Sequence, residues 1–166
     1  TRDTADAVVS GSEIKGQLSS ETDIDYYSIA ATAAGTISIN FDPTVNSSYT
    51  EYYTVSLIDS AGSVLASQDV GKDTDFSAGV TDAGTYYVAV DAYHQSAYIT
   101  YHDSGEYSLT ASITTGSTAN IETEDNNTRD TADAVVSGSE IKGQLSSETD
   151  IDYYSIAATA AGTISI

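Results

Sequence analysis

Hydrophobic and polar residues alternate with a period of two along most of the chain, which is typical of β-strands that bury one face. The segment Gly35–Phe41 reads GTISINF. Its apolar side chains Ile37, Ile39 and Phe41 are therefore expected on one face of a strand. The same alternation predicts further strands at Ser12–Leu18, Asp25–Ala30, Tyr53–Ile58, Ser63–Ser67, Phe76–Val80, Thr85–Val90 and Glu106–Ile113.

Turn signals separate these strands at short intervals. Asp59–Gly62 reads DSAG and joins two of the predicted strands into a β-hairpin, and Asp82–Gly84 reads DAG and predicts another turn. No stretch of ten residues has the periodicity of an amphipathic helix, and the short run Ala30–Gly35 is interpreted as a loop or turn. Many short strands joined by turns predict an all-β sandwich.

The chain contains an exact internal repeat. Residues Thr1–Ile39 and Thr128–Ile166 are identical at all 39 positions, with an offset of 127. A fixed period of domain size indicates a tandem array of domains, in which neighbouring copies of the repeat are partners within one chain. We therefore expect a first repeat at 1–115, an acidic inter-repeat linker at 116–127 and the start of the next identical repeat at 128–166.

The second copy poses a folding problem. Thirty-nine residues with about three strands bury too little surface to fold alone. Because their sequence equals that of the first copy, they could compete with residues 1–39 for one place, swap into a neighbouring chain, or remain frayed. The sequence leaves these alternatives open.

Composition excludes several classes of function. The chain carries 25 acidic and 5 basic residues, with a net charge of −20, so we expect no nucleic-acid partner. No apolar run reaches the roughly 20 residues needed to cross a bilayer, so no direct membrane insertion is expected. The absence of Cys excludes disulfides, thiolate metal sites and a Cys nucleophile. The acidity favours divalent cations, a saline habitat, or simply solubility.

The order of motifs in one period resembles the bacterial pre-peptidase C-terminal domain family, to which the collagen-binding domains of clostridial collagenases are related. The motifs are TADAVV, IKGQL, TDIDYYSI, AGTISI, VSLIDSAGSVLAS, DAGTYYVAV and GEYSLTASI. The resemblance implies a jelly-roll-like antiparallel β-sandwich. It also implies an ancillary module of secreted proteins that carries no catalytic residues. Tandem identical copies look like a large bacterial adhesin, located at the cell surface or secreted.

The resemblance also implies a Ca²⁺ site. In the collagen-binding relatives, a linker motif E-x-E-x-N-[ND] and a loop with two aspartates share the ion, and oxygen ligands are those that Ca²⁺ prefers. The matching residues here are Glu122, Glu124, Asn126, Asn127, Asp150 and Asp152, with a half-site in the first copy at Asp23 and Asp25. An extended linker would point Glu122, Glu124 and Asn126 the same way. The alternative is a solvated acidic linker beside an ordinary turn.

A second candidate site lies in the Tyr- and His-rich stretch between residues 91 and 107. Tyrosines offer large contact areas at low entropic cost and suit binding to sugars or peptides. The candidate ligand-binding residues are Tyr93, His94, Tyr98, Tyr101 and His102. The alternative is a long loop whose tyrosines pack against their own sandwich.

Two functions follow from these patterns. The first is a non-catalytic, calcium-stiffened extender or stalk of a secreted or cell-surface bacterial adhesin. The alternative is an ancillary module that binds a polysaccharide or a surface protein. No nucleophile-elbow motif or phosphate-binding glycine loop is present, so no enzyme is expected.

Overall fold

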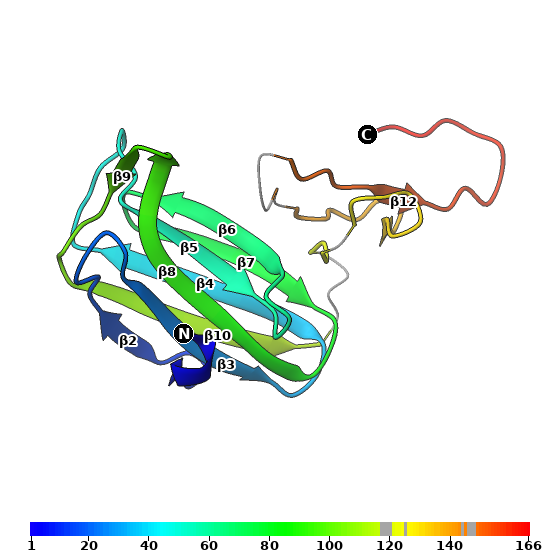
Figure 1. Cartoon of the computed structure of the whole chain (residues 1–166). Coiled ribbons are helices and arrows are strands. Elements are labelled where there is room, and N and C mark those ends of the chain that lie inside the picture. Colours follow the sequence, from blue (N-terminus) through cyan, green and yellow to red (C-terminus); the bar gives the residue numbers. More distant parts are fainter. Residues whose placement is uncertain (117–120, 125, 144, 146–148) are drawn as a thin grey trace.

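The computed structural model describes residues 1–116, 121–124, 126–143, 145 and 149–166. Within residues 1–116, two mainly antiparallel sheets pack face to face (Figure 1). The first sheet has the order β1 (Asp6–Ala7), β3 (Ile24–Ala31), β8 (Gly84–Ser96), β5 (Tyr53–Ile58) and β6 (Val64–Val70), with β9 (Ile99–Tyr101) paired to β8. The second has the order β2 (Glu13–Gly16), β10 (Tyr107–Thr115), β4 (Gly35–Pro43) and β7 (Thr74–Val80). A 3₁₀ helix, η1 (Arg2–Thr4), precedes β1. The predicted all-β antiparallel sandwich is confirmed.

The core lies between the two sheets and follows the sequence alternation. In β4, Ile37, Ile39 and Phe41 are buried, whereas Ser38 and Asp42 are exposed. Each such apolar side chain contributes roughly 1.5–3 kcal/mol when fully buried. At one end of the core the ring of Tyr107 contacts three other rings, with centroids 6.5, 4.9 and 5.9 Å from those of Tyr27, Phe41 and Tyr53.

β8 is longer than the sequence predicts. The prediction that this strand ends at Val90 is wrong, because β8 continues to Ser96 and forms a hairpin with β9. The inward alternation persists as far as Ala92, which is fully buried. The end of the strand consists of the polar residues His94, Gln95 and Ser96, which do not show the apolar alternation that predicts a strand. The β8–β9 hairpin therefore forms much of the Tyr- and His-rich stretch between residues 91 and 107, for which a long loop was the alternative interpretation.

The strand β1 pairs with β3 in parallel, with Asp6 opposite Tyr27. The second copy repeats this pairing between β11 (Asp133–Val135) and β12 (Tyr154–Ile156), with Asp133 opposite Tyr154. Adding 127 to the first pair gives the second, so the identical sequence forms the same local contact twice. Residues 1–39, rather than their second copy, complete the sandwich.

Parts of two predicted segments lie outside the described residues, namely 117–120 and 125 in the linker and 144 and 146–148 in the second copy. Among the residues that the structure describes, no helix is long and apolar enough to span a bilayer.

Candidate metal centre

The linker residues 121–124 run between the sandwich and the second copy. Ile121 forms a parallel bridge with Lys142, and the amide of Glu122 donates a 2.9 Å hydrogen bond to the Lys142 carbonyl. On the other side, the backbone of Glu122 lies against Gly79 of β7. The linker is therefore held between two segments that are far apart in the sequence.

Three carboxylates meet at this junction. Glu122, Glu124 and Asp152 each place an oxygen atom within 4.8 Å of the others. Among the described residues, no other group of three His, Cys, Asp or Glu side chains is arranged in this way. Glu122 is only 5% exposed, so its carboxylate is largely removed from water. Three carboxylates at this spacing repel one another unless a proton or a cation lies among them.

Two donors fix the carboxylate of Glu122. The phenol of Tyr154 donates to Oε2 of Glu122, and Nδ2 of Asn126 donates to the same oxygen at 3.3 Å. Tyr154 also lies 3.4 Å from Oδ2 of Asp152. Both donors therefore bind the same oxygen of Glu122, and one phenol links two carboxylates of the cluster.

Two buried oxygens at the junction have no hydrogen-bond partner. They are Oδ1 of Asn126, a residue with no exposed surface, and Oδ1 of Asp152. A buried oxygen without a donor costs about 1–3 kcal/mol, and a hard cation would satisfy it. Oε1 of Glu124 and Oδ1 of Asp150 are buried nearby in the same segments. The set of carboxylate and amide oxygens fits the chemistry of a hard metal cation.

The pKa of Asp152 is raised because its carboxyl group lies in a partly buried site close to other carboxylates. Burial, together with the neighbouring Glu122 and Asp150, raises the pKa of this carboxyl group to about 6. Burial and the hydrogen bond to Glu122 also raise the pKa of the Tyr154 phenol well above its usual value, so the phenol remains a neutral donor. Asp152 thus holds its proton more tightly than an isolated carboxyl group does.

The six residues predicted as calcium ligands have different places in the structure. Glu122, Glu124 and Asp152 meet in the cluster, and Asn126 contacts it through Glu122. The charge of Asp150 acts on Asp152. Asn127 is exposed, and its Oδ1 accepts a 3.0 Å hydrogen bond from the Ile151 amide. The side chain of Asn127 thus ties the linker to the backbone of the loop.

Sequence reasoning missed two residues of the junction, Tyr154 and Asp133. Asp133 accepts hydrogen bonds from the amide and hydroxyl of Thr123 at 2.7 and 2.9 Å, and from Nδ2 of Asn126 at 3.3 Å. Its place depends on the parallel pairing of β11 with β12, and parallel strands are joined by a crossover connection rather than by a tight hairpin turn. The sequence therefore offered no local pattern that could have identified Asp133.

The half-site of the first copy has different partners. Asp25, the counterpart of Asp152, accepts a 2.5 Å hydrogen bond from the Tyr107 phenol. Burial raises the pKa of Asp25, and the hydrogen bond from Tyr107 opposes that shift. Asp23 accepts hydrogen bonds from the amide and hydroxyl of Ser19 at 2.8 and 2.7 Å, which lower its pKa.

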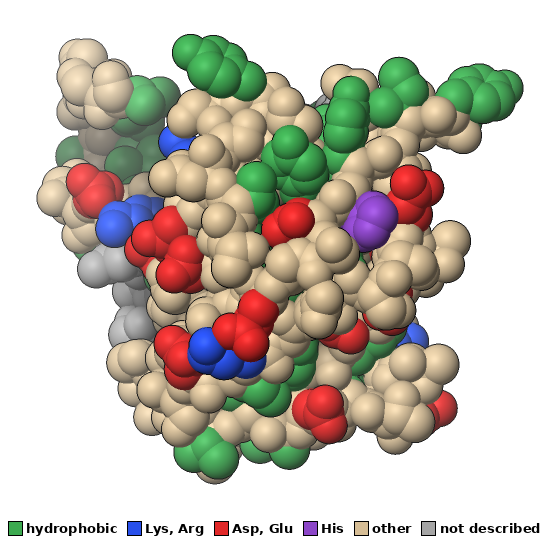
Figure 2. All heavy atoms as spheres, turned by 90° about the vertical axis from the view of Figure 1, so that its left-hand side faces the viewer, with side chains coloured by type: hydrophobic (Ala, Val, Ile, Leu, Met, Phe, Trp, Pro, Cys, Tyr) green, Lys and Arg blue, Asp and Glu red, His purple; other side chains and the backbone are tan. Residues whose placement is uncertain are grey.

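The Tyr- and His-rich stretch lies at the end of the sandwich that carries β9. Tyr93 and Tyr101 are cross-strand partners whose rings stack at 6.4 Å with an angle of 17° between planes. Tyr98, at the tip of the hairpin, is 97% exposed. Figure 2 shows this side of the molecule, where hydrophobic side chains project from the upper rim and acidic side chains spread over the surface. Four of the five predicted residues, namely Tyr93, His94, Tyr98 and Tyr101, thus share one hairpin.

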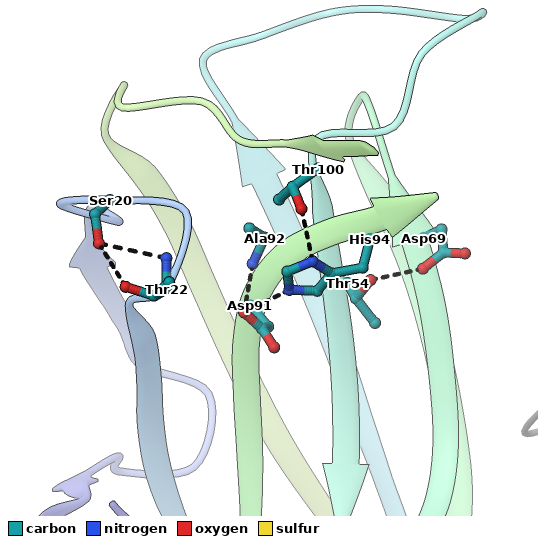
Figure 3. Close-up of polar contacts among 8 residues, drawn as sticks. All are labelled: Ser20, Thr22, Thr54, Asp69, Asp91, Ala92, His94 and Thr100. Atoms are coloured by element: carbon teal, nitrogen blue, oxygen red, sulfur yellow. Dashed lines mark hydrogen bonds and ion pairs between the residues drawn. The ribbon is translucent and has the colours of Figure 1, made fainter. Parts of the chain in front are cut away.

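The two histidines lie apart from the tyrosine stack. Nδ1 of His94 lies 2.9 Å from the Thr100 hydroxyl, and Nε2 lies 3.8 Å from Asp91 (Figure 3). Neighbouring residues alternate across a strand, so His94 and Tyr93 face opposite sides of the hairpin. His102 lies 4.0 Å from Glu21 in a separate loop.

Comparisons with known proteins concern the fold. The chain matches no model of a protein family and no curated protein. Among solved structures, it is similar to the pre-peptidase C-terminal domain of a collagenase from Bacillus anthracis, with 22% identity over 64% of this chain and 93% of that one and a TM-score of 0.49. It is also similar to PliG of Aeromonas hydrophila, a periplasmic inhibitor of g-type lysozyme, with 17% identity over 67% and 96% of the two chains and a TM-score of 0.50. At 17% identity, the second likeness is one of fold, and it agrees with the β-sandwich described above.

Proposed function

We propose that this chain is a non-catalytic, tandem β-sandwich repeat of a secreted or cell-surface bacterial protein, and that Ca²⁺ stiffens the junction between its repeats. The observation that carries the proposal is the cluster of Glu122, Glu124 and Asp152 between the linker and the second copy. The motif resemblance to pre-peptidase C-terminal domains, which are ancillary modules, supports the same conclusion. In an adhesin, such repeats would act as a stalk.

The proposed mechanism is mechanical. Without a cation, the charges of the cluster repel one another and favour opening of the junction. With Ca²⁺ bound, carboxylates from the linker and from the second copy share one ion, so the two segments move together. The linker contacts that would be locked are the hydrogen bonds from Glu122 to Lys142 and from Tyr153 to Asn126.

Calorimetric titration of this chain with Ca²⁺, together with amide hydrogen exchange in EGTA and in millimolar Ca²⁺, tests the proposal. We expect binding with increased protection of the Glu122 and Tyr153 amides. Glu124→Gln and Asp152→Asn should abolish both effects. Asp42→Asn, which removes an exposed charge from β4, is the control and should bind as the unaltered chain does.

Either of two results would contradict the proposal. If Ca²⁺ does not bind, the acids of the linker serve another purpose. If Ca²⁺ binds without protecting the Glu122 and Tyr153 amides, the ion does not stiffen the junction.

The second candidate function is a binding module, and the exposed ring of Tyr98, on the same hairpin as the Tyr93–Tyr101 stack, favours it. Exposed aromatic faces suit weak contacts with sugars or peptides, and repetition along an array would multiply them. A panel of glycans and fibrous proteins, probed with the unaltered chain and with Tyr98→Ala, distinguishes the two functions. A binder should lose affinity on this change, whereas an extender should bind nothing in the panel.

A further inference from the structure

The linker also contacts the sandwich that precedes it. Among the strands that the structure describes, β7 is at the edge of the second sheet and pairs with β4 alone. Its residues Phe76, Ala78 and Val80 face the core, so Gly79 faces outward. Gly79 is nevertheless buried, because the linker covers it.

The fit at Gly79 leaves no room for a side chain. A Cβ atom at this position would lie 2.7 Å from the Glu122 carbonyl oxygen and 2.9 Å from Cγ2 of Thr123. The backbone of Gly79 does not have a positive φ, so close approach rather than backbone conformation explains the glycine. An alanine at this position would force the linker away from β7.

The contact continues beyond Gly79. Leu65, Phe76 and Ala78 of the sandwich line a common cavity with Ile121, Lys142 and Gly143. Ile121 is half-buried there. The half-buried, apolar Ile121 of the linker and residues of β6 and β7 therefore border the same cavity.

Glu122 connects the three parts of the junction. Its carbonyl oxygen lies against Gly79, its amide binds Lys142 of the second copy, and its carboxylate belongs to the cluster. We propose that the outer face of β7 is a docking strip for linker residues 121–123, made possible by Gly79. A cation in the cluster then fixes the preceding sandwich as well as the following copy. This last step rests on the proposed function.

The variant Gly79→Ala tests the docking strip. Its matched control is Gly84→Ala, where a new Cβ would meet only Cε2 of Tyr86 at 4.0 Å. We expect faster exchange of the Glu122 amide in Gly79→Ala than in the control, already without Ca²⁺. With Ca²⁺, we expect an affinity about tenfold lower, the range found when groups that orient metal ligands are lost.

A second variant, in the linker itself, keeps the test decisive if Gly79→Ala disturbs the sandwich. Ile121→Asp leaves β7 unchanged and should release the linker with the same loss of protection. Unchanged exchange of the Glu122 amide in both variants would overturn the docking strip. Failure of the unaltered chain to bind Ca²⁺ would overturn the proposed function instead, while the exchange measurement without Ca²⁺ would still decide the docking.

Discussion

Glu122 lies against Gly143 in the place that Tyr107 takes against Gly16 in the first copy. A Cβ on Gly16 would meet the Tyr107 phenol at 2.4 Å, and one on Gly143 would meet Oε2 of Glu122 at 2.6 Å. In both copies, the second tyrosine of the DYY sequence forms a hydrogen bond with the group that lies against the glycine. Tyr27 bonds to the Tyr107 phenol, and Tyr154 bonds to the Glu122 carboxylate. One local structure thus receives a phenol in the first copy and a linker carboxylate in the second.

This relationship makes Tyr154 a positioning residue for the cluster. Tyr154→Phe removes the donor to Glu122 and its contact with Asp152. We expect Ca²⁺ affinity about tenfold lower, because groups that orient metal ligands have effects of this size. Calorimetric titration measures the change.

The control for Tyr154→Phe is Tyr27→Phe at the equivalent position of the first copy. Tyr27 is buried and shares a 2.7 Å hydrogen bond with Tyr107. Tyr27→Phe should lower the melting temperature of the sandwich and leave Ca²⁺ affinity unchanged. Equal Ca²⁺ affinities in the two variants would refute the role of Tyr154.

The raised pKa of Asp152 predicts how Ca²⁺ binding depends on pH. Ca²⁺ binds the ionised carboxylate, so protons compete with it below a pKa of about 6. We expect affinity to fall by about tenfold for each pH unit below that value and to level off above it. Titrations between pH 5 and pH 7.5 would show this dependence, and a flat profile would contradict it.

The same pKa has the opposite effect on the metal-free junction. The pKa of Asp152 is above its ordinary value of 3.8, so the protonated form is the one that the folded junction favours. Without Ca²⁺, the junction should therefore become more stable as the pH falls through 6. Amide exchange of Tyr153 in EGTA, measured across this range, would show slower opening at lower pH.

The sequence predicted the strands whose alternation is clear, and the reason is local. Residues such as Ile37, Ile39 and Phe41 face a core that lies on one side of their sheet, so burial follows the period of two. The end of β8 escaped prediction because it leaves the core after Ala92, where polar residues become acceptable on both faces. The hairpin with β9 depends on pairing rather than on burial.

The junction could be predicted only in part. The linker acids and the loop aspartates were apparent from motif resemblance. Asp133 and Gly79 were not, since one depends on a parallel strand pair and the other on the path of the linker over β7. Such contacts join segments that are far apart in the sequence, and no periodic pattern in a single sequence identifies them.

Asp133 is expected to hold the linker whether or not a cation is bound. Asp133→Asn removes the negative charge and weakens the hydrogen bonds that this side chain accepts from the amide and hydroxyl of Thr123 and from the side chain of Asn126. Hydrogen bonds to charged groups contribute about 1.5–3 kcal/mol, so we expect the Thr123 amide to exchange at least about tenfold faster. Asp6→Asn, at the identical position of the first copy, should not change that rate. Similar rates in the two variants would rule out this role.

The hydrogen bonds of Tyr107 should be a main source of stability at one end of the sandwich. Its phenol has no exposed surface, donates to Asp25 at 2.5 Å and lies 2.7 Å from the Tyr27 hydroxyl. Burial raises the pKa of Tyr107 far above its usual value, so the phenol stays a neutral donor at any physiological pH. Tyr107→Phe keeps the ring in the core but leaves Asp25 and Tyr27 without this partner.

We expect Tyr107→Phe to lower the free energy of unfolding by about 2–3 kcal/mol, because one of the lost bonds is to a carboxylate. Thermal and urea melts would measure the loss, with Tyr98→Phe as the control at an exposed tyrosine. The slope of unfolding against urea should be the same in both variants, since neither changes the area that unfolding exposes. A stability within about 0.5 kcal/mol of the control, the usual range of surface substitutions, would show that water replaces the phenol as donor to Asp25.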